Sequence, residues 1–565
     1  MEQVLSEATE LGISATDDPR DSEFEGGKRI AVTTVHRLFN GRSIFGVGAE
    51  GVKLRIGSVV VDDVHACVAT INDQFRIRLK KSHPSYQAIF KIVESELKRQ
   101  SLSRFLDLKA GDPRVTMEVP YWTWLGAQDE ITEALHRHRE DDELAFSYPL
   151  LSSVLSQSRC FFSGQVMEIE PYYPATDLVR AFSKAKRRIY MTATLADDSV
   201  LVTHFGAASE NLAPPIVPTS SQSMGERMIL MPQELNPDIE IEEVKALLQK
   251  FAKEENVVVI VPSKSAAKDW ELVADQVLLG DDVVDGIKKL RKKRVGLTVL
   301  INRYDGIDLP DDACRVLVLV GLPEVTSFAE LIDLAVLSES KGGLRRQMQR
   351  VEQGMGRGVR SNDDYCVVLL IGSKLIRRVK SSEGAALLTP ATQAQLELSR
   401  KVAKQLENVK LSDIGGVIEQ CLRRDPDWVK VSKKSLLRAA TSKAELALDE
   451  KSIALRKAFD LSRVGDHKAA VELINSTVTM RRHGYFSDAQ PFNTTSVRLS
   501  LKKRCWRHTG SIPMSPDLLR APHIKNSRGT RMLRQLRYKT TISQVFLRPP
   551  SAFFTSISSL TTCTF

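Results

Sequence analysis

The segment from Gln353 to Arg360 reads QGMGRGVR, and it places two arginines three residues apart, behind a glycine and downstream of a glutamine. A guanidinium carries a permanent charge and five N–H donors in a planar fork, so Arg357 and Arg360 could grip phosphate oxygens and stabilise the charge that develops as a phosphoryl bond breaks. Gly356 would let the backbone approach a phosphate. The pattern therefore predicts a site that senses a phosphate group.

A pair of carboxylates stands at the end of an apolar run far upstream. Residues 59–65 read VVVDDVH. A run of valines is typical of a strand buried on both faces, and here it delivers Asp62 and Asp63 at its C-terminal end. Open α/β sheets bind ligands at that end of their strands, and oxygen ligands suit Mg²⁺. The pair therefore predicts a site for a magnesium nucleotide.

Three further segments have the same form, an apolar strand-like run that leads into polar residues. They read RRIYMTATL (187–195), VVVIVPSKSAAKDW (257–270) and LTVLINRYDGIDLPDDACRVLVLVGLP (297–323). The polar residues that these runs deliver are Thr192, Thr194, Ser263, Asp305, Gly306 and Asp308. Repeated buried strands followed by helical stretches predict an α/β protein.

In order and spacing, these segments resemble motifs II to VI of the superfamily 2 DEAD/DEAH-box helicases. The forms Y-D-G-I-D-L-P and Q-x-x-G-R-x-x-R are most similar to the DinG-like branch, and the resemblance covers residues 30–372. It implies two RecA-like parallel-sheet domains. It also implies ATP hydrolysis, with ATP and Mg²⁺ bound, coupled to movement along nucleic acid, for which single-stranded DNA is the expected partner.

The resemblance also assigns roles to the first-domain residues. Asp62 would hold Mg²⁺ through its water shell. Asp63 would stand where most relatives have the glutamate that polarises the attacking water; an aspartate is one methylene shorter, so its reach to that water differs. His65 would link the nucleotide site to Thr192 and Thr194. Thr33 and Thr34, in the segment IAVTT, would contact the nucleic-acid backbone.

In the second domain, the resemblance makes Arg357 and Arg360 the arginine fingers, with Gln353 supporting them. Asp308 would face the nucleotide ribose or the phosphate contacts of the second domain. Asp305, Gly306 and Gly356 would border the nucleotide, and Ser263 would couple it to nucleic acid.

One expected motif does not occur in the 565 residues. These helicases carry a P-loop, G-x-x-x-x-G-K-[ST], upstream of the carboxylates, whose backbone amides and lysine hold the β-phosphate. We therefore expect a first RecA-like domain without its N-terminal P-loop segment, and ATP turnover that is very weak or nil. A non-catalytic nucleic-acid-binding or regulatory module, or an incomplete gene product, are the alternatives.

Each motif also has a purely structural interpretation. Asp62 and Asp63 could cap a helix, the segment from Thr192 to Thr194 could do the same, and the two arginines could lie on a solvated helix face. A formal G-x-G-x-x-G in GVGAEG (46–51) leads into a strand-like stretch rather than a helix, so we interpret it as a loop.

Composition indicates an ordinary globular protein of several domains, with 42% apolar and 27% charged residues. No run of eighteen apolar residues and no apolar leader occurs, so we expect no membrane association and a cytoplasmic location. The seven cysteines are scattered without a C-x-x-C pair. We therefore expect no disulfide framework, zinc site or iron–sulfur cluster, and Cys67 and Cys366 to be buried.

The net charge of +10 is concentrated at the C-terminal end. Residues 489–565 contain 13 Lys and Arg against the single acidic residue Asp517, which leaves the rest of the chain at −2. Any nucleic-acid groove in the body must therefore depend on local charge. The tail is either a basic nucleic-acid arm or a stretch without a selected fold, such as translation past a frame change.

These observations predict the following organisation. Residues 1–210 would form the first RecA-like domain, with a helical insertion at about 87–157. Residues 211–400 would form the second RecA-like domain, residues 401–488 an appended helical region, and residues 489–565 a basic, low-order tail. The aromatic patch YWTWLG (121–126) lies in the insertion, and we expect it to pack in the core rather than stack on bases.

Overall fold

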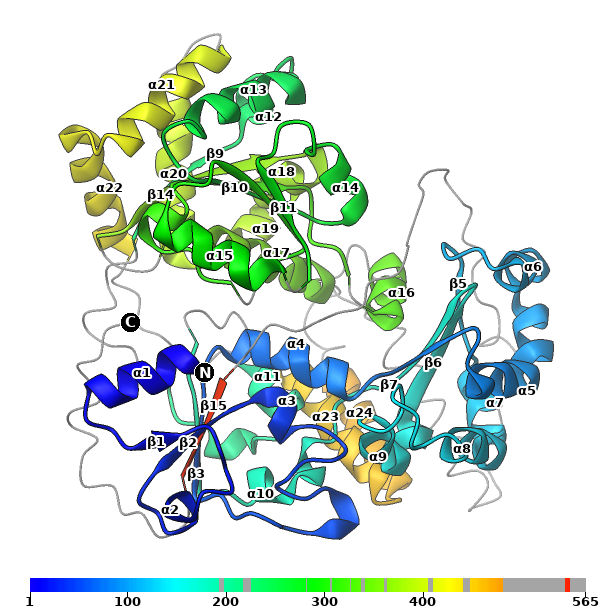
Figure 1. The fold of residues 1–565 in the computed structure, drawn as a ribbon. Coiled ribbons are helices and arrows are strands. Elements are labelled where there is room, and N and C mark those ends of the chain that lie inside the picture. Colours follow the sequence, from blue (N-terminus) through cyan, green and yellow to red (C-terminus); the bar gives the residue numbers. More distant parts are fainter. Residues whose placement is uncertain are drawn as a thin grey trace.

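The computed structural model describes residues 1–192, 198–216, 225–280, 282–304, 307–325, 327–336, 341–359, 363–404, 410–439, 448–480 and 544–548. Three sheets organise these residues: a five-stranded sheet, a six-stranded parallel sheet and a four-stranded antiparallel sheet. Figure 1 shows the six-stranded sheet with its helices above the five-stranded sheet, and the antiparallel sheet beside both.

The first domain is built on the five-stranded sheet, whose order is β1-β2-β15-β3-β8. Its strands are β1 (Ala15–Thr16), β2 (Ile30–Thr34), β15 (Gln544–Arg548), β3 (Ser58–Val61) and β8 (Arg187–Tyr190). Its helices are α1 (Glu2–Glu10), α2 (Ser22–Glu25), α3 (Val35–Leu38), α4 (Val64–Gln74), α10 (Arg180–Ser183) and α11 (Ser199–Thr203). The alternation of strand and helix, with β3 parallel to β8, is that of an α/β domain.

Strand β15 comes from the segment that we expected to be a low-order tail. It runs antiparallel to both of its neighbours, pairing Val545 with Thr33 of β2 and with Val61 of β3. The first sheet is therefore mixed rather than purely parallel, with one strand from the far end of the chain at its centre.

Between β3 and β8 the chain forms an inserted region around the antiparallel sheet, of order β4-β7-β6-β5. Its strands are β4 (Ile77–Lys80), β5 (Thr116–Glu118), β6 (Ser158–Ser163) and β7 (Val166–Pro171). Its helices are α5 (Pro84–Gln100), α6 (Leu102–Ala110), α7 (Tyr121–Gly126), α8 (Gln128–His136) and α9 (Tyr148–Leu151). The insertion that we expected to be helical thus also builds a sheet, of which β5 lies inside the expected bounds.

The second domain is built on the six-stranded sheet, of order β11-β12-β10-β13-β14-β9, in which every pairing is parallel. Its strands are β9 (Glu226–Leu230), β10 (Val257–Val261), β11 (Gln276–Leu278), β12 (Leu297–Ile301), β13 (Val316–Val320) and β14 (Tyr365–Ile371). Strands β10 and β12 are buried along their whole length, which explains their near-continuous Val, Ile and Leu sequences. Strand β9 is equally buried but includes Glu226 and Arg227.

Helices cover both faces of this sheet. They are α12 (Pro232–Leu235), α13 (Ile241–Phe251), α14 (Lys264–Lys268), α15 (Asp282–Lys292), α17 (Lys341–Met355), α18 (Ser373–Lys380), α19 (Ser382–Ala386) and α20 (Pro390–Lys404). Helix α16 (Phe328–Val336), which follows β13 along the chain, packs instead on the inserted region. Val244 and Leu248 of α13 pack on one face, and Leu290 of α15 and Met348 of α17 pack on the other. The sheet is therefore enclosed on both sides, as a parallel sheet requires.

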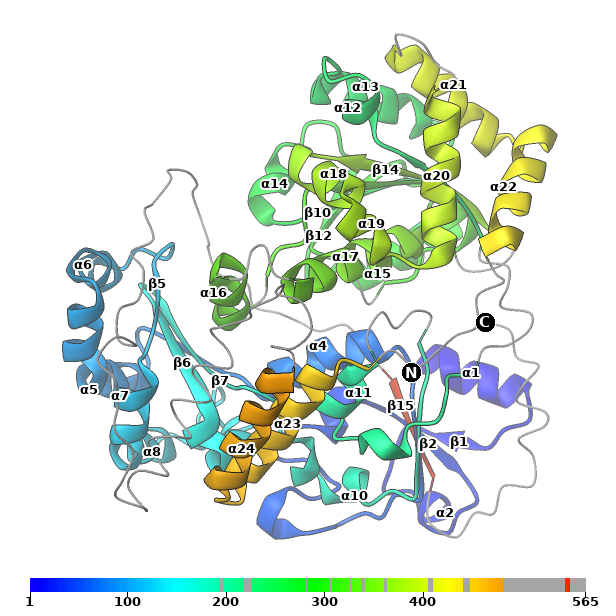
Figure 2. The same cartoon turned by 180° about the vertical axis from the view of Figure 1, so that it is seen from behind.

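The C-terminal helices are shared between the two domains (Figure 2). Helices α21 (Leu411–Leu422) and α22 (Pro426–Ala439) pack on the second domain, where Ile414 and Trp428 join its core. Helices α23 (Glu450–Arg463) and α24 (His467–Met480) pack together, and Phe459 of α23 joins the core of the first domain. Arg456 of α23 donates to the carbonyls of Pro174 and Thr203 at 3.1 and 2.6 Å.

Short 3-10 turns complete the described elements: η1 (Gly48–Glu50), η2 (Ser152–Gln157), η3 (Thr176–Leu178), η4 (Ser209–Asn211), η6 (Asp311–Ala313) and η7 (Gly356–Gly358). The segment GVGAEG forms η1 and the loop around it, as predicted. Trp124 of the aromatic patch is buried, and its indole N–H donates to the Leu155 carbonyl at 2.8 Å, so core packing is confirmed there. Cys67 and Cys366 are buried thiols, also as predicted.

The α/β fold class predicted from the sequence is confirmed: the second domain has an all-parallel sheet, and the first domain has a mixed one. Within the described ranges, none of the helices combines the length and the apolar character that crossing a bilayer requires.

Candidate functional site

The two carboxylates lie in the turn that joins β3 to α4. Asp63 adopts a left-handed backbone conformation, with φ of 47°, and caps α4 by accepting the Ala66 N–H at 3.4 Å. Asp62 Oδ1 accepts the Asp63 N–H at 2.9 Å. Both side chains are half-buried at the carboxyl end of the strand, and their oxygens are the donors that Mg²⁺ prefers. Helix capping and a magnesium site are compatible here, because a carboxylate has two oxygens.

The turn is tied to the end of β8. The Met191 N–H donates to the Val61 carbonyl at 2.8 Å, and the Val64 N–H donates to the Met191 carbonyl at 3.2 Å. Thr192 therefore follows directly behind the carboxylate turn, as the sequence predicted for the two segments. Thr194 lies outside the described residues.

The positions of the two threonines of β2 do not match the expectation that both contact nucleic acid. Thr33 is fully buried, and its hydroxyl has no hydrogen-bond partner among the described residues. Thr34 accepts the Arg37 N–H at 3.3 Å and so caps α3. Because β2 is an interior strand of this sheet, Thr33 does not reach the surface, and of the two only the half-buried Thr34 borders solvent.

On the second domain, the segment QGMGRGVR forms the end of α17 and the turn η7. A Cβ added at Gly358 would lie 2.6 Å from Cys366 Sγ, and one at Gly354 would lie 2.9 Å from the Tyr304 ring. These two glycines therefore allow close packing within the domain. A Cβ on Gly356 would meet no atom within 4 Å, so the backbone at Gly356 is open to a ligand.

Arg357 is held by the loop that follows β12. Its Nε donates to the Tyr304 carbonyl at 3.1 Å, and its Nη1 donates to the Ile307 carbonyl at 2.9 Å. The guanidinium thus braces the loop that contains Asp305 and Gly306, which themselves lie outside the described residues, as Arg360 does. Gln353 is half-buried on α17. In this arrangement Arg357 is a positioning residue for its own domain.

Two other predicted residues of the second domain have defined neighbours. Asp308 Oδ2 accepts from Arg291 Nη2 of α15 at 3.0 Å. Ser263 caps α14 by accepting the Ala266 N–H at 3.3 Å. Burial raises the pKa of the Glu324 carboxyl, and a hydrogen bond from the Ser263 hydroxyl opposes that shift.

The two domains meet at His65 and Gln349. The Gln349 Nε2 lies 2.7 Å from His65 Nδ1, so α17 of the second domain contacts the first turn of α4 in the first. Sequence reasoning identified His65 but missed Gln349, which lies one helical turn before Gln353 on the same face. The helical spacing of the two glutamines was the available signal. The contact brings the end of α17 toward the carboxylate turn.

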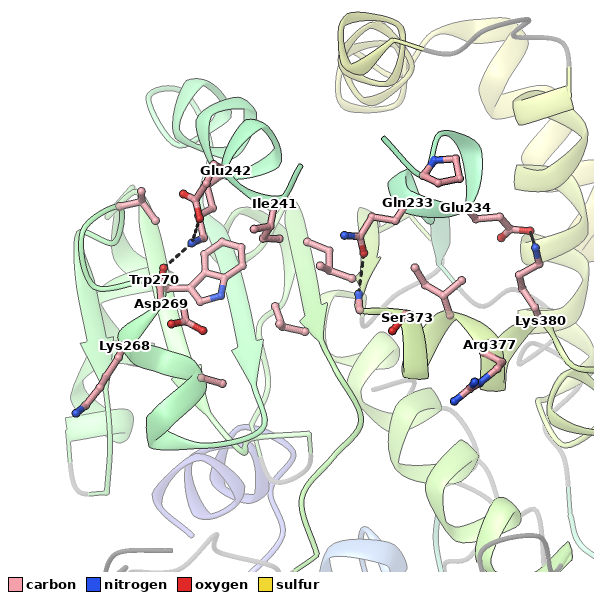
Figure 3. A pocket seen from close by; sticks show the side chains of 18 of the residues that line it. Gln233, Glu234, Ile241, Glu242, Lys268, Asp269, Trp270, Ser373, Arg377 and Lys380 are labelled. Atoms are coloured by element: carbon pink, nitrogen blue, oxygen red, sulfur yellow. Dashed lines mark hydrogen bonds and ion pairs between the residues drawn. The ribbon is translucent and has the colours of Figure 1, made fainter. Parts of the chain in front are cut away.

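A separate hollow of about 1400 Å³ opens on the second domain, beside the carboxyl ends of β13 and β14 (Figure 3). Several of its polar groups are paired: Lys245 Nζ with Glu242 at 2.8 Å, and the Gly372 N–H with Gln233 Oε1 at 3.1 Å. Lys268 and Arg377 line it, are exposed, and form no ion pair within the described part of the chain. Ala266 and Lys268 extend from the helix that Ser263 caps.

Residues 239–387 match the family described as Helicase C-terminal domain. The match lies within the six-stranded domain and contains every second-domain residue predicted above, from Ser263 to Arg360. It supports a helicase-type function.

Solved structures with a related fold include an XPD helicase (14% identity, 58% of this chain and 66% of that chain, TM-score 0.34). They also include Xpd4 of S. tokodaii (16%, 67% and 85%, TM-score 0.40) and an apo XPD (14%, 58% and 74%, TM-score 0.35). The chain thus spans just under two thirds of the first of these proteins. No curated protein matches the chain.

Proposed function

We propose that the chain is a cytoplasmic superfamily 2 helicase or translocase of the DinG-like type. The parent reaction of that type couples ATP hydrolysis to movement on single-stranded DNA, and it is impaired here because the sequence contains no P-loop. The observation that carries the proposal is the contact between helix α17 of the second domain and helix α4 of the first. The helicase-type domain presents α17 to the turn that contains Asp62 and Asp63, and the contact is the 2.7 Å hydrogen bond between Gln349 and His65. A nucleotide between the two domains would be bordered by residues of both.

The two carboxylates would have different roles. Asp62 would hold Mg²⁺, which when bound with ATP neutralises the charge on the phosphates. Asp63 would orient the attacking water, and its fixed left-handed backbone holds its carboxylate in one place while it also caps α4. His65 and Gln349 would transmit the state of that site to the second domain, because a change at the turn moves the residue that α17 contacts.

Arg357 would reach a phosphate only after leaving its carbonyl partners. Its two hydrogen bonds to the loop are at 3.1 and 2.9 Å, and a phosphate offers a charged acceptor in exchange. Gly356 and the open space around it would admit that phosphate. We propose that Arg360 joins it as the second finger.

We further propose that the 565 residues by themselves turn ATP over very weakly or not at all, because the sequence contains no G-x-x-x-x-G-K-[ST]. The test is the ATPase rate of the full chain with and without single-stranded DNA, with Asp63→Asn as the reference for background hydrolysis. A DNA-stimulated rate comparable to that of P-loop-containing helicases would contradict the weak turnover, and any stimulated rate that Asp63→Asn abolishes would support the assignment of the site.

A nucleic-acid-binding module without turnover is the second candidate, and the engagement of Arg357 with Tyr304 and Ile307 favours it. Lys268 and Arg377, at the hollow of the second domain, are cations available to a phosphate backbone. Binding of labelled single-stranded DNA with and without ATP and Mg²⁺ separates the candidates. An affinity that responds to nucleotide supports the helicase, and an affinity that does not supports the module.

A further inference from the structure

Helix α16 belongs to the second domain in sequence but packs on the inserted region. It lies between β13 and α17 along the chain, and both views place it against the antiparallel sheet, away from the core of its own domain (Figures 1 and 2). Phe328 and Ala329, at 8% and 5% exposure, form a small apolar cluster with Phe161 of β6, which is fully buried. Val166 and Ile332 border the cluster.

A buried carboxylate fixes the start of α16. Glu168 of β7 is fully buried, and its Oε2 accepts the Phe328 N–H at 2.7 Å while its Oε1 accepts from Arg78 Nε at 2.7 Å. A buried charge is costly unless its hydrogen bonds are satisfied. Departure of α16 would remove one partner of Glu168 and expose the carboxylate to water, which can replace that partner.

An ion pair fixes the middle of the helix. Arg159 of β6 is largely buried; its Nη1 contacts Asp333 of α16 at 3.0 Å, and its Nε contacts Glu118 of β5 at 2.7 Å. Its guanidinium also lies over the Phe161 ring, 4.8 Å from the centroid. If Asp333 moves away, Arg159 keeps its ion pair with Glu118. The contact between α16 and β6 can therefore open without leaving the Arg159 guanidinium unpaired.

The opposite side of α16 is tied to the helix that reaches the first domain. Arg350 of α17 lies 3.7 Å from Glu330 of α16 and donates to the Glu324 carbonyl at 3.0 Å. The residue before Arg350 is Gln349, which contacts His65. Helix α16 is thus bonded on one side to the inserted sheet and on the other to α17.

We propose that α16 is a latch that holds the second domain to the inserted sheet and so sets the separation of the two parallel-sheet domains. The interface between α16 and the inserted sheet can open at low cost, because its apolar cluster is small. When it opens, Arg159 keeps Glu118 as a partner, and water can replace the Phe328 N–H at Glu168. Opening releases α17 from the inserted sheet and allows Gln349 to withdraw from His65. The inference does not depend on whether the chain hydrolyses ATP.

The test is the distance between spin labels at Arg137 of the inserted region and Lys253 of the second domain, both exposed, in the full chain. We expect Asp333→Arg, which places like charges together, at least to double the population of longer distances. Asp333→Glu, which keeps the opposite charge facing Arg159, should leave the wild-type distribution unchanged. Asp285→Asn is the control, because that exposed residue forms its ion pair within its own helix, with Lys288 at 3.8 Å.

Melting curves accompany each variant, to confirm that the chain is folded. Phe328→Ala, which removes the apolar contact and leaves both charges in place, is the second variant and should also lengthen the distances. Distributions that match the wild type in both Asp333→Arg and Phe328→Ala would overturn the proposal, as would a charge-conserving Asp333→Glu change that lengthens the distance as much as Asp333→Arg.

Discussion

Gln349 of helix α17 lies 2.7 Å from the imidazole of His65, and through this hydrogen bond the helicase-type domain contacts the helix that begins at Asp63. His65 is the third residue after Asp62, and Gln349 is four residues before Gln353. The contact therefore joins the two motifs that carry the proposed chemistry. Any movement between the domains must lengthen or break it.

Replacing both His65 and Gln349 should reveal the energy of the hydrogen bond between them. We expect the His65→Ala and Gln349→Ala changes to be less than additive by about 0.5–1.5 kcal/mol in the free energy of unfolding, the usual net value of one hydrogen bond. The measurement is a double-mutant cycle by denaturant unfolding. Gln347→Ala, also half-buried on α17, serves as the control. Strictly additive changes in the His65 and Gln349 cycle would show that the contact carries no energy.

Arg357 should matter to the stability of its own domain. Arg357→Ala leaves the carbonyls of Tyr304 and Ile307 without their charged donor, and we expect a loss of about 2–3 kcal/mol, because hydrogen bonds from charged groups contribute about 1.5–3 kcal/mol each and water satisfies part of the loss. Arg357→Lys keeps the charge but lacks the planar fork whose Nε and Nη1 reach the two carbonyls, so it should recover only part of the loss.

Thermal unfolding of these variants is the measurement, and Arg377→Ala is the control because Arg377 is exposed and has no ion pair within the described ranges. If Arg357→Ala were as stable as the control, the bracing role would be wrong, and the guanidinium would be free for a phosphate.

The glycines of QGMGRGVR should differ in their tolerance of a methyl group. Gly358→Ala would place a Cβ 2.6 Å from Cys366 Sγ, and overpacking of this kind costs about 1–3 kcal/mol. Gly356→Ala meets no atom within 4 Å and should change stability little. Denaturant unfolding compares the two. Adding Cys366→Ala removes the obstructing sulfur, so the pair of changes should cost less than the sum of the two; equal costs at both glycines would contradict the packing.

Local sequence was sufficient for the fold class and for part of the site. Valine-rich runs identified β10, β13 and β14, because strands buried on both faces carry continuous apolar sequence. The same pattern located β3, although buried and half-buried residues alternate along that strand. The position of Asp62 and Asp63 at a strand end followed from the same runs. Backbone pairing then placed Met191 beside Val64, as the order of the segments implied.

Contacts between distant segments were not predictable in this way. The Glu168 carboxylate meets the Phe328 N–H across 160 residues, and no periodicity in either segment encodes that partner. The same holds for β15, whose short apolar sequence QVFLR is compatible with a strand but does not specify a position between β2 and β3. Burial of Thr33 follows from that position, which is why its surface role was mispredicted.

Acidification should destabilise the first domain through His204. Burial, aided by the positive charges of Arg456 and Arg346, lowers the pKa of His204 to about 3. Above pH of about 6.5 the imidazole is neutral in both the folded and the unfolded chain, so it adds no pH dependence there. Below that pH the imidazole binds a proton in the unfolded chain but not in the folded chain. The free energy of unfolding therefore decreases as the pH falls toward 3.

At pH 5 the loss from this one group is at most about 2 kcal/mol, because one unit of pKa difference corresponds to about 1.4 kcal/mol. His204→Gln keeps a side-chain amide that can hydrogen-bond the Thr203 hydroxyl, which lies 2.8 Å from Nδ1, but it cannot be protonated. The melting temperature of this variant should therefore fall less than that of the wild type between pH 7.5 and 5. His136→Gln, at an exposed position on α8, should follow the wild type. Equal pH dependence in all three proteins would exclude His204 as the source of acid sensitivity.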